Sequence, residues 1–238
     1  MARKLAETSN SYIVSLLNKL TNKDTNSEHY ANIMYELGKE FGQILIKKIQ
    51  TEIHTISLAS TVEDADSLGK GIIEVLESHG KNVLLTVFWN KRYKPNDNNG
   101  ISIAPILREF HQPGYKEAPL LIIIKSIIAN SCVVRTNLTK LISESNPVKV
   151  FVVAPVLLKD APQKLESEFE DSISAKFDYL YFAEDDEKDE NGNVQPGIGG
   201  DVYKRLGFEG QDAKNKYVPE IVKKRRNYVS NYSNTLSL

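Results

Sequence analysis

APLLIIIKSIIANSCVVRTNLTKLI, residues 118–142, is the stretch that decides the fold. Leu120–Ile124 is a continuous apolar run rich in β-branched residues, which is typical of a strand buried on both faces of a parallel sheet. Asn130 and Ser131 supply turn chemistry, and Thr136–Ile142 has the pattern of the start of a helix. A strand that runs through a loop into a helix is where α/β proteins place a phosphate, because helix N–H groups converge there.

The loop within this stretch lacks the residues that usually form such a site. It contains no glycine and no acidic residue, and Lys125 stands where the strand ends. The frame of a phosphate site is therefore present without its usual chemistry.

Apolar runs and helical patterns alternate along the rest of the chain. Further strands are expected at Ile53–Leu58, Asn82–Trp89, Val148–Leu158 and Tyr179–Ala183, and helices at residues 9–20, Gly71–Glu77 and Ala161–Phe169. Residues 101–115 fit either a short strand or a flap. The alternation predicts an α/β fold with a mostly parallel, doubly wound sheet, N-terminal helices and a C-terminal helical tail. Leu120–Ile124 is expected to be its central strand.

One long amphipathic helix is predicted near the N-terminus. Thr25 with Glu28 fits a capping box, and Ser27 is an alternative cap. Apolar residues from Tyr30 to Leu45 then form one stripe, which we interpret as a core-packing face. The stripe also offers more surface than one small core needs, which favours a dimer.

Composition restricts the class of protein. The 238 residues carry a net charge of −1, so the chain has no overall bias toward nucleic acid or anionic membrane. No apolar run approaches the ~18–20 residues of a membrane span, and we expect no signal peptide. Cys132 is the only cysteine, which excludes an intrachain disulfide and a multi-cysteine zinc site. A cytoplasmic location follows as the expectation.

Three later segments have unusual composition. Glu184–Glu190 is an acidic run that fits a solvated loop better than a cation site, because it lacks EF-hand spacing. Residues 191–210 concentrate glycines directly after a predicted strand, where backbone can approach a small ligand. The tail from Gln211 carries four consecutive basic residues at Lys223–Arg226, which we interpret as a solvated helix end rather than a nucleic-acid site.

These segments together resemble uracil phosphoribosyltransferase, a type I phosphoribosyltransferase. The resemblance runs from about Asn10 to Gly210 and rests on three stretches: FDYLYFAEDDEKDENGNVQPGIGGDVYKRLGFEG (177–210), LTNKDTNSEHY (20–30) and VKVFVVAPVLLKDAPQKLESEF (148–169). It implies a phosphoribosyltransferase-like domain at residues 1–210, with a helical arm at 9–50 and a basic extension at 211–238. It also implies a homodimer.

The nucleobase end of the family's site has a counterpart here. The resemblance implies that a Pro-Gly-x-Gly backbone segment holds the edge of the base. The residues that match this segment and its flanks are Val194, Pro196, Gly197, Ile198, Gly199, Gly200 and Asp201.

The phosphate end departs from the family. Lys125 stands where the family has an aspartate, and its Thr-Gly-Gly-Ser cradle reads Asn130, Ser131, Cys132 and Val133 here. The basic residue of the pyrophosphate loop is absent, and the acids Glu63, Asp64 and Asp66 lie nearby, where they would repel pyrophosphate. The arginine that the family has after its second strand does not stand at the same position here. Lys91 or Arg92 could take its place as an anion contact.

Three functions therefore compete. We favour a catalytically degenerate member of this fold that binds a nucleobase or nucleotide in a regulatory or partner-dependent role. An active nucleobase phosphoribosyltransferase of pyrimidine salvage, with a rebuilt phosphate site, comes second. A nucleic-acid or protein interaction module comes third. We assign no catalytic residue, no metal site and no cofactor, with magnesium required only if the protein is active. A protein partner is compatible with the first reading, whereas a membrane and nucleic acid are disfavoured.

Overall fold

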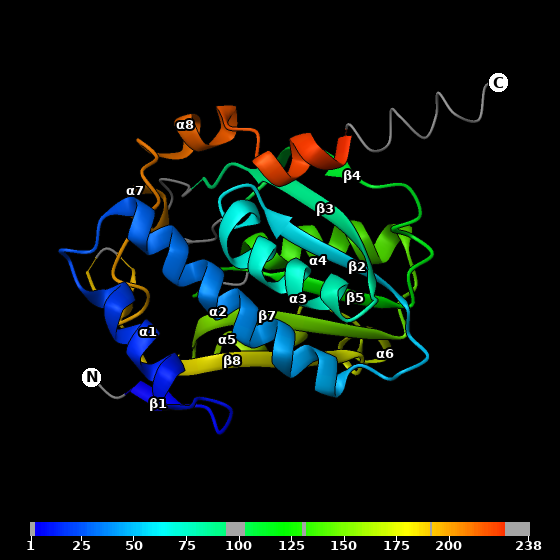
Figure 1. The fold of residues 1–238 in the computed structure, drawn as a ribbon, viewed down its shortest axis with the longest axis horizontal. Coiled ribbons are helices and arrows are strands. Elements are labelled where there is room, and N and C mark those ends of the chain that lie inside the picture. The colour runs from blue at the N-terminus through cyan, green and yellow to red at the C-terminus, as the bar shows by residue number, and fades with distance from the viewer. Residues whose placement is uncertain (1–2, 94–102, 130–131, 191, 227–238) are drawn as a thin grey trace.

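The computed structural model of the chain describes residues 3–93, 103–129, 132–190 and 192–226 (Figure 1). Its main sheet has the order β1-β8-β7-β5-β2-β3-β4, and the short β6 lies beside β7. The strands are β1 Arg3–Leu5, β2 Thr55–Thr61, β3 Asn82–Asn90, β4 Ile106–His111, β5 Leu120–Ile124, β6 Ile127–Ile128, β7 Lys149–Leu158 and β8 Phe177–Asp185. A separate hairpin joins β9 Glu187–Lys188 to β10 Val194–Gln195.

The predicted α/β class is confirmed. Strands β2, β3, β5, β7 and β8 run parallel, and only the edge strands β1 and β4 pair antiparallel within this sheet. Every residue of β5 is buried, which agrees with its central place and its continuous apolar sequence. The ambiguous stretch before it contains the edge strand β4, and residues 101–102 lie outside the described chain.

Helices cover both faces of the sheet. In Figure 1, α2 and α3 lie in front of the strands and α4 lies behind them. The helices are α1 Ser11–Thr21, α2 Ser27–Lys48, α3 Lys70–Ser78, α4 Cys132–Glu144, α5 Ala161–Glu166, α6 Asp171–Ser174, α7 Val202–Arg205 and α8 Gln211–Lys216, with a π-helical turn η1 at Ala65–Gly69. Among the described helices, none is long and apolar enough to cross a membrane.

The start of α2 differs from the prediction. Asn26, not Thr25 or Ser27, is the N-cap, and its side chain accepts a hydrogen bond from the His29 N–H at 2.9 Å. Thr25 instead donates to the carbonyl of Lys19 at the end of α1. The short amide of Asn26 satisfies one of the first helical N–H groups, which is the role that a cap residue has.

The apolar stripe of α2 is buried within the chain. Tyr30, Leu37, Phe41 and Leu45 have no exposed surface. The helix also approaches the η1–α3 segment so closely that a Cβ atom at Gly38 would lie 2.3 Å from the Leu68 carbonyl oxygen. The stripe is therefore used by the chain's own core and gives no separate argument for a dimer.

The described part of the predicted C-terminal extension packs against the sheet. Residues 211–226, which we call the C-terminal strap, lie along β3 and β4 (Figure 1). Trp89 donates its indole N–H to the carbonyl of Tyr217 at 2.8 Å, and Arg225 donates to the carbonyl of Val83 at 2.8 Å. Val222 of the strap is fully buried. The strap therefore belongs to the same packed body as the sheet.

Candidate functional site

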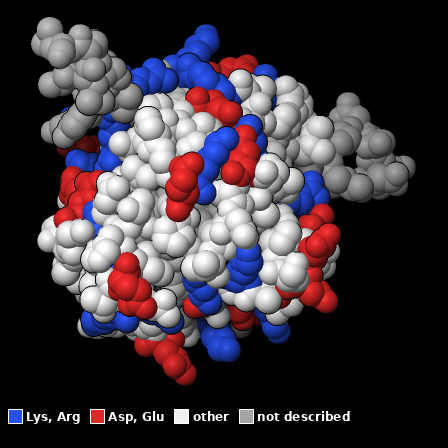
Figure 2. Space-filling model, turned by 90° about the vertical axis from the view of Figure 1, so that its right-hand side faces the viewer, with Lys and Arg blue, Asp and Glu red and all other residues white. Residues whose placement is uncertain are grey.

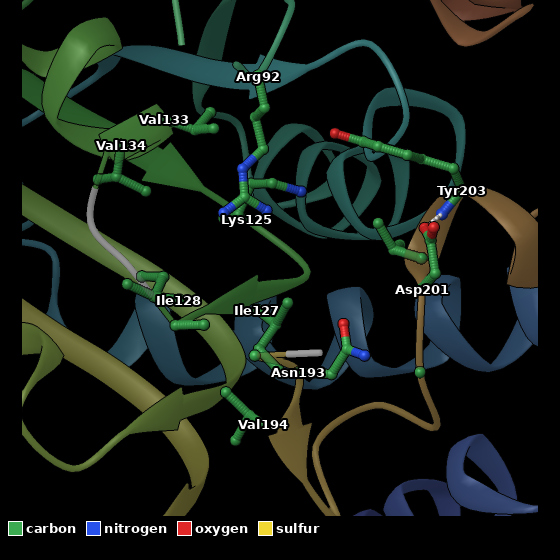
Figure 3. A pocket seen from close by; sticks show the side chains of 14 residues that line it. Arg92, Lys125, Ile127, Ile128, Val133, Val134, Asn193, Val194, Asp201 and Tyr203 are labelled. Carbon is green, nitrogen blue, oxygen red and sulfur yellow. Dashed lines mark hydrogen bonds between the residues drawn. The ribbon is translucent and has the colours of Figure 1, made fainter. Parts of the chain in front are cut away.

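A pocket of about 170 Å³ lies at the carboxyl edge of the sheet (Figure 3). Open α/β sheets bind ligands at this edge. Its walls come from the chain after β3 and β5, from β6, from the first turn of α4 and from the segment between β10 and α7. The lining residues are Arg92, Lys125, Ile127, Ile128, Ala129, Val133, Val134, Gly192, Asn193, Val194, Gly200, Asp201, Val202 and Tyr203.

The sheet itself fixes the floor of the pocket. Strand β5 ends at Ile124, and the N–H of Lys125 still bonds to the Val153 carbonyl of β7 at 3.0 Å. After Ser126 the chain rejoins β7 as β6, where Ile127 pairs with Val156. This break between β5 and β6 holds Lys125 inward, with only 7% of the residue exposed.

Lys125 is paired with the acidic residues of the loop after β2. Its ammonium group lies 2.7 Å from Asp64 Oδ2 and 3.1 Å from Glu63 Oε1. Asp64 also accepts hydrogen bonds from the Thr61 hydroxyl at 2.9 Å and the Ser126 N–H at 3.1 Å. Both acids are buried, so the expectation that they would face and repel an anion is wrong. They neutralise Lys125 instead.

A second lysine from the C-terminal strap completes this charge cluster of Glu63, Asp64, Lys125 and Lys214. Lys214 is 1% exposed; its ammonium lies 3.5 Å from Glu63 Oε2 and donates to the Asn90 carbonyl at 2.7 Å. Two carboxylates thus face two ammonium groups, and their formal charges cancel.

The protonation states follow from opposing effects. Burial opposes ionisation of Glu63, but Lys125 and Lys214 outweigh it and lower the pKa of Glu63 to about 2. Burial likewise disfavours the Lys125 ammonium, but Asp64 and Glu63 outweigh it and raise the pKa of Lys125. Burial, assisted by Lys125, lowers the pKa of Lys214 against the attraction of Glu63. Glu63 and Lys125 therefore stay ionised at neutral pH, and Lys125 is not free to bind an external anion.

The predicted base-binding segment divides into two parts. Val194, Gly200 and Asp201 line the pocket, whereas Pro196, Gly197, Ile198 and Gly199 are not among its lining residues. Of these four, Gly197 and Ile198 are buried and the other two are partly exposed.

The backbone groups of this inner part already have partners. The Gly197 N–H donates to Asp185 Oδ2 at 2.8 Å, and the Gly197 carbonyl accepts from Arg3 at 2.6 Å. The Tyr30 hydroxyl donates to the Ile198 carbonyl at 2.9 Å. These three backbone groups are therefore already paired and are not free to recognise the edge of a base.

Asp185 departs from the predicted solvated acidic run. It has no exposed surface and forms a two-point contact with the Arg3 guanidinium, at 2.8 Å and 2.7 Å. The expectation of solvation is wrong for this residue, because the run begins within β8 and points one carboxylate inward. Arg3 and Asp185 together hold the segment after β10 in place.

The remaining predicted site residues lie as follows. Val133 lines the pocket, whereas Cys132 is buried beside Ala104. Asn130 and Ser131 lie outside the described residues. Of the two candidate anion contacts, Arg92 lines the pocket.

The other candidate, Lys91, pairs with Asp212 of the strap at 3.0 Å. Within the described ranges, no group of three or more His, Cys, Asp or Glu side chains is placed to hold a metal ion.

Sequence reasoning missed Tyr203, Lys214 and Arg3. Tyr203 lines the pocket, and burial together with Glu63 raises its pKa, so its hydroxyl stays protonated and can donate. Lys214 and Arg3 reach the site from opposite ends of the chain. No local pattern marks either one, because each finds its partner far away in the sequence.

Comparisons with known proteins support the fold. No protein-family model matches the sequence, and no curated protein matches it. Among solved structures, the AQ2163 protein from Aquifex aeolicus is similar with a TM-score of 0.70 and 18% identity, over 87% of this chain and 99% of that chain. Hypoxanthine-guanine phosphoribosyl transferase of L. donovani matches with a TM-score of 0.40 and 10% identity, over 65% and 77% of the two chains. Hypoxanthine phosphoribosyltransferase of Staphylococcus aureus matches with a TM-score of 0.42 and 14% identity, over 62% of this chain and 73% of that chain. The first likeness shows that this chain and the AQ2163 protein share a fold.

Proposed function

We propose that this chain is a uracil phosphoribosyltransferase-like protein that binds a nucleobase or nucleotide and does not transfer phosphoribose. Its role is then regulatory or exercised through a partner. The observation that carries the proposal is the pairing of Lys125 with Glu63 and Asp64 at 2.7–3.1 Å. The residue at the family's aspartate position is a cation, and it is already neutralised from within.

The chemistry of phosphoribosyl transfer supports this reading. Pyrophosphate departs as positive charge develops on the sugar, which needs a pre-formed anion cradle and a bridging metal ion. A lysine cannot hold magnesium as a carboxylate does. Glu63 and Asp64 are carboxylates, but the ammonium groups of Lys125 and Lys214 occupy them.

The pocket suits a small, flat ligand. Ile127, Ile128, Val133 and Val134 provide apolar walls, and Tyr203 points toward the cavity from the far side (Figure 3). The volume of about 170 Å³ lies below the roughly 300–1,000 Å³ of pockets for drug-sized molecules. A nucleobase alone, or with a sugar extending outward, matches this size class.

The face drawn in Figure 2 gives no support for nucleic acid as the ligand. Figure 2 shows one face of the molecule, and acidic and basic side chains are interspersed over it. Nucleic-acid sites instead gather Lys and Arg into a continuous basic surface.

An active enzyme is the second candidate, and Arg92 is the observation that favours it. Its guanidinium lines the pocket and could replace part of the missing phosphate cradle. In that case turnover requires magnesium and yields uridine monophosphate from uracil.

Two measurements separate these candidates. Calorimetry with uracil, uridine monophosphate and phosphoribosyl pyrophosphate tests binding, and conversion of radiolabelled uracil to nucleotide with magnesium tests turnover. We expect binding of base or nucleotide and no turnover. Turnover near 1 per second, within the range of ordinary enzymes, would establish the active reading.

A pocket variant links binding to this site. Ala129→Leu adds volume at a partly exposed lining position, so it should weaken binding. Ala175→Leu adds the same volume at the exposed end of α6 and should leave binding unchanged. Equal affinity in both variants would place the ligand elsewhere.

A further inference from the structure

Two walls of the pocket are held from outside by the C-terminal strap. Arg92, in the chain after β3, and Tyr203, in α7, both line the pocket and direct their side chains into it (Figure 3). The strap residues Gln211 and Lys214 contact these two residues. No residue of 211–226 lines the pocket itself, so the strap acts on the ligand site through the walls.

Gln211 bonds to the backbone of Arg92 at both of its polar groups. The Arg92 N–H donates to Gln211 Oε1, and Gln211 Nε2 donates to the Arg92 carbonyl at 3.1 Å. This two-point contact gives Arg92 the pairing that a neighbouring strand gives within a sheet, at a place where β3 has ended. The preceding residue, Lys91, pairs with Asp212 of the strap at 3.0 Å. The backbone that carries the Arg92 side chain into the pocket is therefore fixed by the strap.

Lys214 supports the wall formed by α7. Its ammonium lies 4.8 Å from the centre of the Tyr203 ring, which is a cation–π contact. The same ammonium donates to the Asn90 carbonyl at the end of β3 at 2.7 Å and lies 3.5 Å from Glu63 Oε2. One buried group thus joins β3, the charge cluster and α7. These contacts exist only while the strap is docked, because the ammonium belongs to the strap.

The loop between β2 and α3 anchors the strap. Asp66, in η1, accepts hydrogen bonds from the Tyr217 hydroxyl, from the Glu220 N–H at 2.8 Å and from the Ile221 N–H at 2.9 Å. The last two N–H groups stand at the start of the helical residues 220–226, where an acceptor is needed. Together with the contact between Glu63 and Lys214, this means that two of the acids after β2 bind the strap.

We propose that Gln211 and Lys214 are positioning residues of the pocket, and that docking of the strap and binding of the ligand strengthen each other. This inference rests on the proposed function and assigns the regulation of the same site. A ligand that contacts the walls in their observed arrangement binds the docked state more tightly than the undocked state. Such coupling is reciprocal, so the ligand must also stabilise docking. A partner or modification that displaced the strap would release the ligand.

Gln211→Ala tests the coupling with the least disturbance of the core. Gln211 is uncharged and partly exposed, whereas Lys214 is buried against Glu63. The substitution removes both bonds to the Arg92 backbone. Gln163→Ala removes the same side chain at an exposed position of α5 and is the matched control. Calorimetry with uracil and uridine monophosphate measures affinity, and amide hydrogen exchange of the full chain, followed by NMR, measures docking of the strap.

We expect Gln211→Ala to weaken binding about 10-fold, the size typical of one or two hydrogen bonds, and Gln163→Ala to leave it unchanged. The ligand should slow amide exchange at residues 211–217 of the unmodified chain, and this slowing should be smaller in Gln211→Ala. The exchange measurement needs no variant, so it decides the question even if Gln211→Ala folds poorly. A strap with a structural role alone would leave its exchange unchanged when the ligand binds.

The outcomes separate this inference from the proposed function. If uracil or uridine monophosphate binds but Gln211→Ala binds it as tightly as Gln163→Ala does, or the ligand leaves exchange of the strap unchanged, the coupling is wrong and the proposed function stands. If neither probe binds, the proposed function fails and the coupling fails with it. Exchange of the Arg92 amide in the ligand-free chain then tests the positioning role: faster exchange in Gln211→Ala than in Gln163→Ala supports it, and equal rates would overturn it.

Discussion

Replacing Lys125 by methionine tests the buried charge cluster most directly. Methionine keeps most of the length of the lysine side chain and removes its charge. The change leaves two buried carboxylates, Glu63 and Asp64, with Lys214 as their one remaining cation in the cluster, 3.5 Å from Glu63. We expect the folded state to be strongly destabilised.

The magnitude follows from burial and partners. Lys125 makes contacts of 2.7 Å and 3.1 Å with two acids that are 1% and 5% exposed. Removing one partner of such a buried pair costs about 3–5 kcal/mol, because the other charge is left uncompensated. The exposed pair Lys164–Asp160, at 3.5 Å, is the matched control. Lys164→Met should cost less than about 1 kcal/mol.

Urea unfolding followed by tryptophan fluorescence provides the assay. Trp89 is the only tryptophan and is 1% exposed, so its emission reports loss of the core. The double variant Lys125→Met, Asp64→Asn should recover part of the loss, because the asparagine carbonyl still accepts from Thr61 and carries no charge. A cost below about 1 kcal/mol for Lys125→Met, or strict additivity in the double variant, would refute the closed cluster.

Four further predictions concern other parts of the molecule. The pKa of Glu63 is lowered from 4.5 to about 2 in the folded chain, so the free energy of unfolding should fall as the pH drops from 4.5 through 2. When the midpoint of urea unfolding is plotted against pH, Glu63→Gln should show a smaller fall over this range. Gly199→Ala places a Cβ atom 2.3 Å from the Leu20 carbonyl oxygen, whereas Gly192→Ala, at nearly the same positive φ, meets open space. Thermal melts should show the Gly199 variant to be less stable than the Gly192 variant by about 1–3 kcal/mol, and equal melting temperatures would contradict the contact. Deleting residues 211–238 removes the partner of the Trp89 N–H, so it should expose the indole, shift its emission to longer wavelength and lower the unfolding midpoint; unchanged emission would show that the strap is dispensable. Light scattering at micromolar concentration should give twice the 26.8 kDa chain mass if the homodimer implied by the resemblance forms, and a monomer mass would exclude it.

The strands of the core could be predicted from sequence because their apolar runs are local signals. Leu120–Ile124 and Lys149–Leu158 are continuous hydrophobic stretches, which buried parallel strands require. Strand β1 carried no such signal, since Arg3–Leu5 is short, mostly polar and defined only by pairing with β8.

The chemistry of the site was harder to predict, because it depends on pairs that are distant in sequence. Charged residues are rarely buried, so Glu63 and Asp64 were expected to face solvent or ligand. Their burial becomes understandable only when Lys125 and Lys214 are placed beside them. Sequence patterns report periodicity, and they carry no information on which of 30 Lys and Arg residues reaches a given acid.

This placement also changes how the site could be re-engineered. Restoring an aspartate at position 125 alone would put a third carboxylate against Glu63 and Asp64. Like charges at such distances destabilise each other strongly. A variant that recovers a phosphate cradle therefore has to replace Glu63 and Asp64 together with Lys125.

The pairing of Glu63 with Lys214 has a consequence for how the protein is made. Chains leave the ribosome from the N-terminus, and domains begin to fold as they emerge. Glu63 is synthesised well before Lys214, the second of the two lysines that contact it. The nascent chain can pair its parallel strands in the meantime, yet this acid cannot reach its final environment. We expect the last step of folding to wait until residues 211–226 have been synthesised, when the strap can close over the sheet.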